Sequence, residues 1–310
     1  MAVLNLTPTF HQDTYPSISP TKPSLTQAGK TILITGGGGG IGFEIARSFA
    51  KASASRIIIV GRRGGLLDEA VAKLRNEFAS SKTEFISHQT DIAFDASIAS
   101  LWEFLHSQNI LVHVLVLNAA QFQPLAPDTL SLSRDALMEA FNLNVGGNFS
   151  MAANFVKQVL CPKGLQLNLV HLSTGGIHMP LPAAITYAVT KSSFTGLLGR
   201  IADERPVEDV QIISFHPGIF SSEGSERDFG KDVFRLDDQF ALAGDFAVWA
   251  ASPEASWLHG RFVWAHWDVD EMKSDPEILK RLKGEIGYLK PGSTFRLSEN
   301  ESERALIGPY

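Results

Sequence analysis

The chain has 310 residues, of which 44% are hydrophobic, so it is long enough to bury one large core. Its 27 Lys and Arg residues against 33 Asp and Glu residues give a formal net charge of −6, which excludes a broad basic surface for nucleic acid or anionic lipid. A local basic pocket stays possible. The single cysteine, Cys161, excludes an intramolecular disulfide and is typical of a reducing compartment.

The N-terminal residues 1–28 contain Pro8, Pro16, Pro20 and Pro23, which are too closely spaced for a helix. We therefore expect an extended N-terminal arm. The arm has no basic segment followed by an apolar one, and no apolar run in the chain approaches membrane-spanning length. These features favour a cytoplasmic protein without a membrane partner.

From residue 29 to residue 271, short runs of β-branched residues alternate with longer segments of helical periodicity. The predicted strands are residues 31–35, 56–60, 84–89, 112–117, 166–172, 210–215 and 260–264. Strands separated by helices indicate βαβ units, so we predict a single α/β domain of the Rossmann type, with a doubly wound, seven-stranded parallel sheet flanked by helices. The charged residues 272–310 predict a C-terminal helix followed by a polar tail.

The first predicted strand runs directly into five consecutive glycines, which are followed by Ile41 and Gly42. Glycines let a backbone approach a pyrophosphate, and the helix N-terminus that follows offers free N–H groups and a positive dipole end. A glycine run by itself also suits a flexible loop, but the strand before it and the amphipathic helix after it predict a dinucleotide site. We assign to this site Thr35, Gly36, Gly40, Ile41 and Gly42.

The second predicted strand ends in Gly61, Arg62 and Arg63, at the place where an NAD-binding domain carries an acidic residue for the ribose 2′-hydroxyl. Two guanidinium groups instead suit a 2′-phosphate, so we predict NADP(H) as the cofactor. A solvated turn is the alternative interpretation of the arginines. Asp91, followed by Ile92, is placed to reach the adenine amino group, although an aspartate in a turn would look the same.

Tyr187 and Lys191 are four residues apart, a spacing that places both side chains on one face of a helix. A phenol is too weak an acid to exchange protons readily at neutral pH, and a nearby ammonium group lowers its pKa by stabilising the phenolate. Such a pair can act as a general acid/base toward a carbonyl or an alcohol. The same spacing also arises often by chance.

Several further motifs accompany this pair and the glycine turn. In chain order they are Asn118-Ala119-Ala120, Asn144 in Asn-Val-Gly-Gly, Ser173-Thr174, Tyr187 with Lys191, and Pro217-Gly218. With these motifs in this order, residues 29–270 resemble the short-chain dehydrogenase/reductase family. Residues 257–271 and the N-terminal arm resemble fungal members, many of which serve secondary metabolism.

The resemblance implies a role for each motif. Tyr187 would be the proton donor or acceptor, and Lys191 would bind the nicotinamide ribose and lower the tyrosine pKa. Asn144 would hold a water that continues the proton relay. The implied cofactor contacts are Asn118, Ala119, Tyr187, Lys191, Pro217, Gly218 and Ile219.

Two positions depart from the family's pattern. The family usually has a serine thirteen residues before the tyrosine, where this chain has Thr174 directly after Ser173. A threonine hydroxyl donates the same hydrogen bond, but its methyl group narrows the pocket, so we favour Thr174 and keep Ser173 as the alternative. Leu117 stands where the family commonly has the first asparagine of Asn-Asn-Ala-Gly, which removes a structural hydrogen-bonding group and leaves the chemistry in place.

Residues 220–240 follow the implied nicotinamide contact, and in the family this region forms a mobile lid over the substrate. Its aromatic residues would line an apolar pocket or pack the lid onto the domain; they are Phe220, Phe229, Phe234 and Phe240. His178 would face the substrate or lie in a surface loop. We assign Phe220 and His178 as substrate-binding residues.

We therefore expect an NADP-dependent dehydrogenase/reductase that acts on CH–OH groups. It would transfer a hydride between NADPH and a ketone, aldehyde or imine of an apolar small molecule, with Tyr187 as general acid/base. No metal site is indicated, since the histidines lack ligand spacing. A homodimer or homotetramer is implied by the resemblance. Two alternatives stay open: a non-redox dehydration, isomerisation or cyclisation in the same fold, motivated by Thr174, and a dinucleotide-sensing binding protein without turnover.

Overall fold

In the computed structural model, the described residues are 5–122, 125–126, 128–179, 181, 183–220 and 238–292. They contain one all-parallel sheet with the strand order β3-β2-β1-β4-β5-β6-β7, which confirms the predicted doubly wound architecture. Its strands are β1 (Thr31–Thr35), β2 (Arg56–Gly61), β3 (Glu84–Gln89), β4 (Val114–Leu117), β5 (Leu167–Leu172), β6 (Val210–His216) and β7 (Arg261–Trp264).

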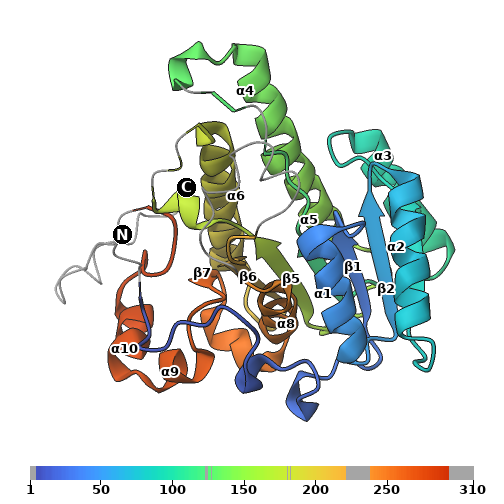
Figure 1. Cartoon of the computed structure of the whole chain (residues 1–310), viewed down its shortest axis with the longest axis horizontal. Coiled ribbons are helices and arrows are strands. Elements are labelled where there is room, and N and C mark those ends of the chain that lie inside the picture. The colour runs from blue at the N-terminus through green and yellow to red at the C-terminus, as the bar shows by residue number, and fades with distance from the viewer. Residues whose placement is uncertain are drawn as a thin grey trace.

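Helices cover both faces of the sheet (Figure 1). One face carries α1 (Gly40–Lys51), α2 (Gly64–Glu77) and α8 (Phe240–Ala250), and the other carries α3 (Asp95–Ser107), α5 (Asn148–Val156) and α6 (Ile185–Glu204). The shorter helices are α4 (Arg134–Phe141), α9 (Val269–Ser274) and α10 (Pro276–Gly284). Within the described part of the chain, no helix combines the length and the apolar character needed to cross a bilayer.

The two faces are filled from the same strands because successive side chains in a strand point in opposite directions. In β2, Ile57 and Ile59 join the core beneath α1 and α8, while Ile58 and Val60 join the core beneath α3 and α5. A parallel sheet covered on both sides therefore needs continuous apolar runs rather than an alternating pattern. This is the physical reason that the strands could be located from β-branched runs alone.

The N-terminal segment packs against the end of the chain that follows β7. It contains two 3-10 turns, Pro16–Ile18 and Pro23–Leu25, and buries Tyr15, Ile18 and Leu25 in the core that includes α8. The Tyr15 hydroxyl donates to the Trp267 carbonyl at 3.0 Å, and Lys22 pairs with Glu254 at 2.9 Å. Residues 5–28 are thus an integral part of the packed molecule.

Candidate active site

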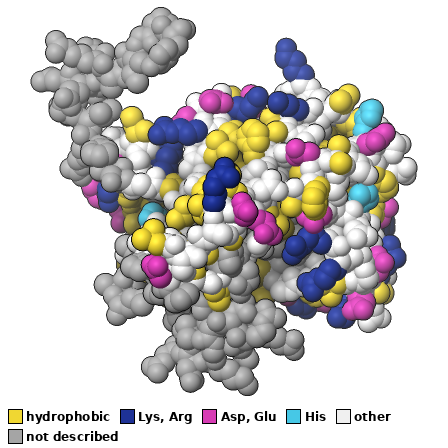
Figure 2. Space-filling view, turned by 90° about the horizontal axis from the view of Figure 1, so that it is seen from above, with side chains coloured by type: hydrophobic (Ala, Val, Ile, Leu, Met, Phe, Trp, Pro, Cys, Tyr) yellow, Lys and Arg dark blue, Asp and Glu magenta, His cyan; other side chains and the backbone are white. Residues whose placement is uncertain are grey.

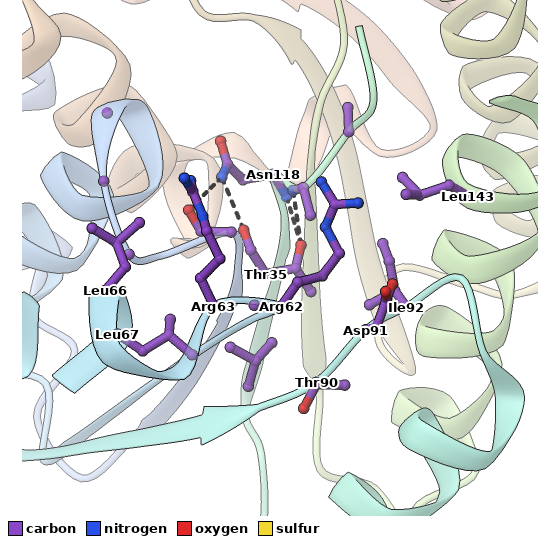
Figure 3. Close-up of a pocket in the computed structure, with 18 residues that line it drawn as sticks. Thr35, Arg62, Arg63, Leu66, Leu67, Thr90, Asp91, Ile92, Asn118 and Leu143 are labelled. Carbon is purple, nitrogen blue, oxygen red and sulfur yellow. Dashed lines mark hydrogen bonds between the residues drawn. The ribbon is translucent and has the colours of Figure 1, made fainter. Parts of the chain in front are cut away.

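A cavity of about 760 Å³ opens at the carboxyl edge of the sheet, where the strand order reverses between β1 and β4 (Figure 3). Loops that follow such strands diverge and leave a crevice, in which doubly wound proteins bind their ligands. Nine of the predicted cofactor residues line it, namely Thr35, Gly36, Gly40, Arg62, Arg63, Asp91, Ile92, Asn118 and Ala119. Outside this lining lie Ile41, Gly42, Tyr187, Lys191, Pro217, Gly218 and Ile219.

Other lining residues were not assigned from the sequence. They are Gly38, Gly39, Val60, Gly61, Leu66, Leu67, Thr90, Ala120 and Leu143. Most of them adjoin an assigned residue, so a wider window around each motif would have included them. Leu66 and Leu67 are different, since they reach the cavity from the first turns of α2, and their helical pattern gave no sign of a ligand.

The glycine turn closes tightly against its neighbours. Gly36 has φ +70°, and a Cβ there would lie 2.8 Å from the Asn118 side-chain nitrogen. A Cβ on Gly42 would approach the Gly36 carbonyl oxygen to 2.3 Å, so this glycine is needed for helix packing although it lies behind the cavity wall. No side chain caps the N-terminus of α1, so its first N–H groups stay available to an anion.

Asn118 ties the end of β4 to the turn after β1. Its side-chain amide donates to the carbonyl oxygens of Thr35 at 2.9 Å and Gly36 at 3.2 Å. In return, the Thr35 hydroxyl accepts from the backbone N–H groups of Asn118 and Ala119, both at 3.0 Å (Figure 3). These bonds fix the shape of the cavity wall, so the asparagine supports the cradle in addition to lining it.

The two arginines after β2 are exposed, and neither forms an ion pair with a carboxylate among the described residues. Figure 3 shows both side chains extending along the cavity in the same direction. Asp91 lies at the other side of the cavity, where its carboxylate accepts from the Ala93 N–H at 3.0 Å. This bond is the contact expected of an aspartate in a turn, which was the alternative interpretation of Asp91. The residue nevertheless lines the cavity.

Tyr187 and Lys191 both project from α6, as their spacing predicted. The Lys191 ammonium nitrogen lies 5.8 Å from the centre of the Tyr187 ring and donates to the Leu172 carbonyl at 2.5 Å. Burial lowers the pKa of Lys191 to about 7 and raises the pKa of Tyr187 to about 12. The pKa of Tyr187 therefore moves in the direction opposite to the expected lowering. Removing the phenolate from water destabilises it more than Lys191, whose ammonium is bonded to a backbone carbonyl, stabilises it.

Asn144 lies in a π-helical stretch, Asn142–Gly147, between α4 and α5. Its side-chain amide donates to the Gln121 carbonyl at 2.8 Å and to the Thr190 hydroxyl at 3.0 Å, and its oxygen accepts from the Gln121 N–H at 2.7 Å. π-Helical turns cost stability and concentrate at functional sites. Here the turn fixes Asn144 beside α6 and fastens the loop that leads away from the cavity.

The adjacent hydroxyls of Ser173 and Thr174 are in different environments. Ser173 is buried, and its hydroxyl bonds to the Thr195 hydroxyl of α6 at 2.7 Å. Thr174 is half-buried, and its hydroxyl accepts from the Gly176 N–H at 3.2 Å, which leaves its own proton free to donate. This geometry favours Thr174 over Ser173 as the hydroxyl that meets a substrate.

The predicted substrate contacts are in different surroundings. His178 is exposed, and its ring lies 5.3 Å from that of Phe262. Phe220 stacks on Phe240 at 4.7 Å, while Phe229 and Phe234 fall outside the described residues. Phe122, which was not assigned from the sequence, lies 4.6 Å from the Tyr187 ring.

The described residue ranges lack clustered metal ligands. They contain no group of three or more His, Cys, Asp or Glu side chains arranged to hold a metal ion.

Comparison with known proteins gives a consistent result. The family model described as short chain dehydrogenase matches residues 30–231. The short chain dehydrogenase/reductase nsrO of Aspergillus novofumigatus is 34% identical over 85% of this chain and 89% of its own length. AacuD of Aspergillus aculeatus is 32% identical, over 87% of this chain and 91% of its own, and a relative from Claviceps purpurea is 31% identical, over 88% and 90%.

Solved structures share the fold. A short chain dehydrogenase/reductase family protein superposes with a TM-score of 0.65 at 26% identity, covering 77% of this chain and 97% of its own. RhlG of Pseudomonas aeruginosa, in an NADP active-site complex, gives a TM-score of 0.69 at 19% identity, covering 78% and 96%. At such identity the second likeness concerns the arrangement of the sheet and helices.

Proposed function

The chain belongs to the short-chain dehydrogenase/reductase family, and from this premise we propose that it is an NADPH-dependent reductase of a carbonyl or imine on an apolar small molecule. Membership implies an oxidoreductase with a nicotinamide cofactor. The choice of NADPH, the direction of reaction and the substrate class are inferred from the residues of this chain.

The observation that carries the proposal is the pair formed by the half-buried Tyr187 and the buried Lys191 on α6. Ala120 lines the cavity, and Phe122, two residues further along, contacts the Tyr187 ring. A tyrosine with a pKa of about 12 keeps its proton at neutral pH, so it is ready to act as an acid and poorly suited to act as a base. This protonation state matches the acid role that reduction of a carbonyl requires.

The cavity residues fit NADPH. The close packing at Gly36 leaves room for backbone against a pyrophosphate but none for a side chain, and the uncapped N-terminus of α1 faces the same space. The unpaired guanidinium groups of Arg62 and Arg63 suit a 2′-phosphate, and Asp91 can accept from an adenine amino group. When bound, the reduced nicotinamide supplies the hydride.

The side chains around Tyr187 would handle the proton. Thr174 donates its hydroxyl proton to the substrate oxygen and orients it, and Tyr187 gives the phenol proton to the same oxygen as negative charge develops there. Lys191, when charged, stabilises the phenolate that results. Asn144, bonded to Thr190 one residue before Lys191, holds this part of α6 in place.

An apolar substrate is supported by aromatic side chains beside Tyr187 and in the segment that follows β6. Phe122 packs against the Tyr187 ring. Phe220 and Phe240, the first and last residues of the segment 220–240, stack on each other. Because similar relatives come from the fungi Aspergillus and Claviceps, we place the substrate among the secondary metabolites of fungi. The free thiol of Cys161 is compatible with the cytosol, which we propose as the compartment.

We also propose that the chain forms a homodimer or homotetramer. Met138 of α4, Phe149 of α5 and Val189 of α6 are 51%, 45% and 43% exposed, which is unusual for large apolar side chains on neighbouring helices. Hydrophobic side chains gather in patches among charged ones on the face seen in Figure 2. Light scattering of the purified chain would give its mass, and a monomer would contradict this part of the proposal.

The function is tested with NADPH that carries deuterium at the transferred position of the nicotinamide. The protein is incubated with this cofactor and a panel of apolar polycyclic ketones, quinones and imines, with Tyr187→Phe as the control. We expect a product that has gained deuterium, with matching loss of NADPH, and little product from the control. A dehydrated or isomeric product with NADPH unspent would replace the proposal by a non-redox reaction, and tight NADPH binding without any product would support a dinucleotide sensor.

A further inference from the structure

A buried carboxylate lies directly beneath the loop that follows β6. The Asp238 side chain is 0% exposed, and its Oδ2 accepts from the backbone N–H of Ile219 at 2.7 Å. The same oxygen accepts from Nε2 of His266, which is 1% exposed, at 2.9 Å. Asp238 thus joins the loop after β6 to the segment after β7, two stretches that are far apart in the sequence.

The loop and the carboxylate are closely fitted. Gly218 has φ +122°, and a Cβ on this residue would lie 2.9 Å from Asp238 Oδ2 and 3.0 Å from the Phe220 ring. The loop therefore lies directly against the carboxylate, with no room for a side chain at residue 218. Pro217, Gly218 and Ile219 are the residues that we assign to the nicotinamide end of the cofactor.

The N-terminal segment closes the other side of this pair. The Phe10 ring stacks on the His266 ring at 4.4 Å and 15°, and the His11 N–H donates to the His266 carbonyl at 2.8 Å. The Gln239 N–H, next to Asp238, donates to the Gln12 carbonyl at 2.8 Å. Residues 10–12 therefore hold both partners of the pair from outside.

The neighbouring His216 does not compete for the carboxylate. Its ring lies 5.5 Å from that of His266, and burial lowers the pKa of His216 to about 3, so it is neutral at physiological pH. A buried carboxylate is costly unless donors satisfy it, and the described donors to Asp238 are Ile219 and His266. Both bonds end on Oδ2, whereas Oδ1 has no hydrogen-bond partner among the described residues, so these two donors make the polar contacts of the buried group.

We propose that Asp238 and His266 are positioning residues, which hold residues 217–219 in place for the nicotinamide, and that Phe10 makes the N-terminal segment part of this device. The inference rests on the proposed function, since it requires NADPH in the cavity. It adds a role for a segment that the chemistry of Tyr187 does not involve. The adenosine end of the cavity lies on the far side of β1 and shares none of these contacts.

The test compares the binding of two ligands with the full-length protein. NADPH spans both ends of the cavity, whereas 2′,5′-ADP reports on the adenosine end alone. For Asp238→Ala we expect the affinity for NADPH and kcat each to fall about tenfold or more, because two bonds to a charged group are lost. Affinity for 2′,5′-ADP should stay within about twofold, since that end is remote. Asp238→Asn keeps one acceptor for Ile219 and should restore part of the loss.

The matched control is Asp245→Asn. Asp245 is also buried and also bonds the N-terminal segment, through Thr14 at 2.6 Å, but it contacts Ser48 of α1 rather than the loop. Phe10→Ala provides a second variant, which leaves the pair itself intact should Asp238→Ala fail to fold. Equal changes for NADPH and 2′,5′-ADP, or the same change in Asp245→Asn, would overturn the inference. A wild-type chain that bound neither ligand would instead overturn the proposed function.

Discussion

At the proposed adenosine end of the candidate site, the groups that line the cavity are the backbone of the glycine turn and the exposed guanidinium groups of Arg62 and Arg63. At the other end they are side chains withdrawn from water, with Lys191 2% exposed and its pKa lowered to about 7. The first end offers backbone N–H groups and guanidinium groups, which suit the phosphates of a cofactor. The second end depends on burial to set the state of its acid.

This contrast between a solvated end and a buried end suggests that one end binds the cofactor and the other carries out the chemistry. Charges in a solvated cavity contribute mainly to holding the cofactor, whereas groups in a buried setting act on charge that develops during the reaction. Substitutions at the two ends should therefore change different kinetic constants. Substitutions at each end can test this division.

Replacing Tyr187 by Phe should have the largest effect, because it removes the proton that the developing alkoxide needs. We expect kcat to fall about 10²- to 10⁴-fold, while the dissociation constant for NADPH changes little. Steady-state kinetics and fluorescence titration with NADPH measure the two quantities. A parallel loss of NADPH affinity would break the division between the two ends.

Thr174→Ala should lower kcat by about 100-fold, since a donor to the substrate oxygen is lost. Ser173→Ala is a matched control that removes the neighbouring hydroxyl. Its bond to Thr195 is buried and structural, so it should cost about 1 kcal/mol of the free energy of unfolding and leave kcat near the wild-type value. If Ser173→Ala were the variant that lost activity, the assignment of the hydroxyl would have to be reversed.

The double variant Arg62→Ala, Arg63→Ala should weaken NADPH binding about 10- to 100-fold, because charge-assisted hydrogen bonds to a phosphate are lost. Binding of NADH, which lacks that phosphate, and kcat at saturating cofactor should hardly change. Arg56→Ala is the control, since Arg56 begins the same strand and pairs with Glu84 at 2.6 Å. Equal losses for NADH and NADPH would indicate that the arginines act on the turn rather than on the phosphate.

Lys191→Met should stabilise the fold at pH 6 by about 1 to 3 kcal/mol while impairing catalysis, because burying the ammonium is costly. The pKa of Lys191 is about 7 in the folded state against an ordinary value of 10.5, so below pH 7 the lysine is charged in both states and its full penalty applies. Between pH 7 and 10.5 the unfolded state binds more protons than the folded state, so the stability of the wild type rises with pH. The difference in unfolding free energy between Lys191→Met and the wild type then shrinks. Urea unfolding across this range measures it, with exposed Lys163→Met as control.

If the difference in unfolding free energy between the wild type and Lys191→Met stayed constant from pH 6 to pH 10.5, burial would not lower the pKa of Lys191 in the folded state. The buried end would then hold its charge as easily as the exposed arginines hold theirs. That outcome would remove the energetic contrast between the two ends, although each could still keep its kinetic role.

Much of the sheet could be located from the sequence. β1 and β3 have the predicted bounds, since their ends are marked by the glycine turn and by polar residues. β4 begins at Val114 rather than at residue 112, because the Val112 N–H and carbonyl both bond the Gln158 side chain instead of a neighbouring strand. Such a side-chain partner, 46 residues away, leaves no local signal.

The sequence by itself determined the parts that depend on local spacing: the parallel sheet, the glycine turn before α1, and Tyr187 and Lys191 on one face of α6. Only the tertiary structure decided which hydroxyl is buried, in which direction the tyrosine pKa moves, and that Phe10, Asp238 and His266 meet beneath the loop after β6. The physical reason is that desolvation and long-range hydrogen bonds depend on which distant segments surround a group. Periodicity and motif spacing carry no information about those neighbours.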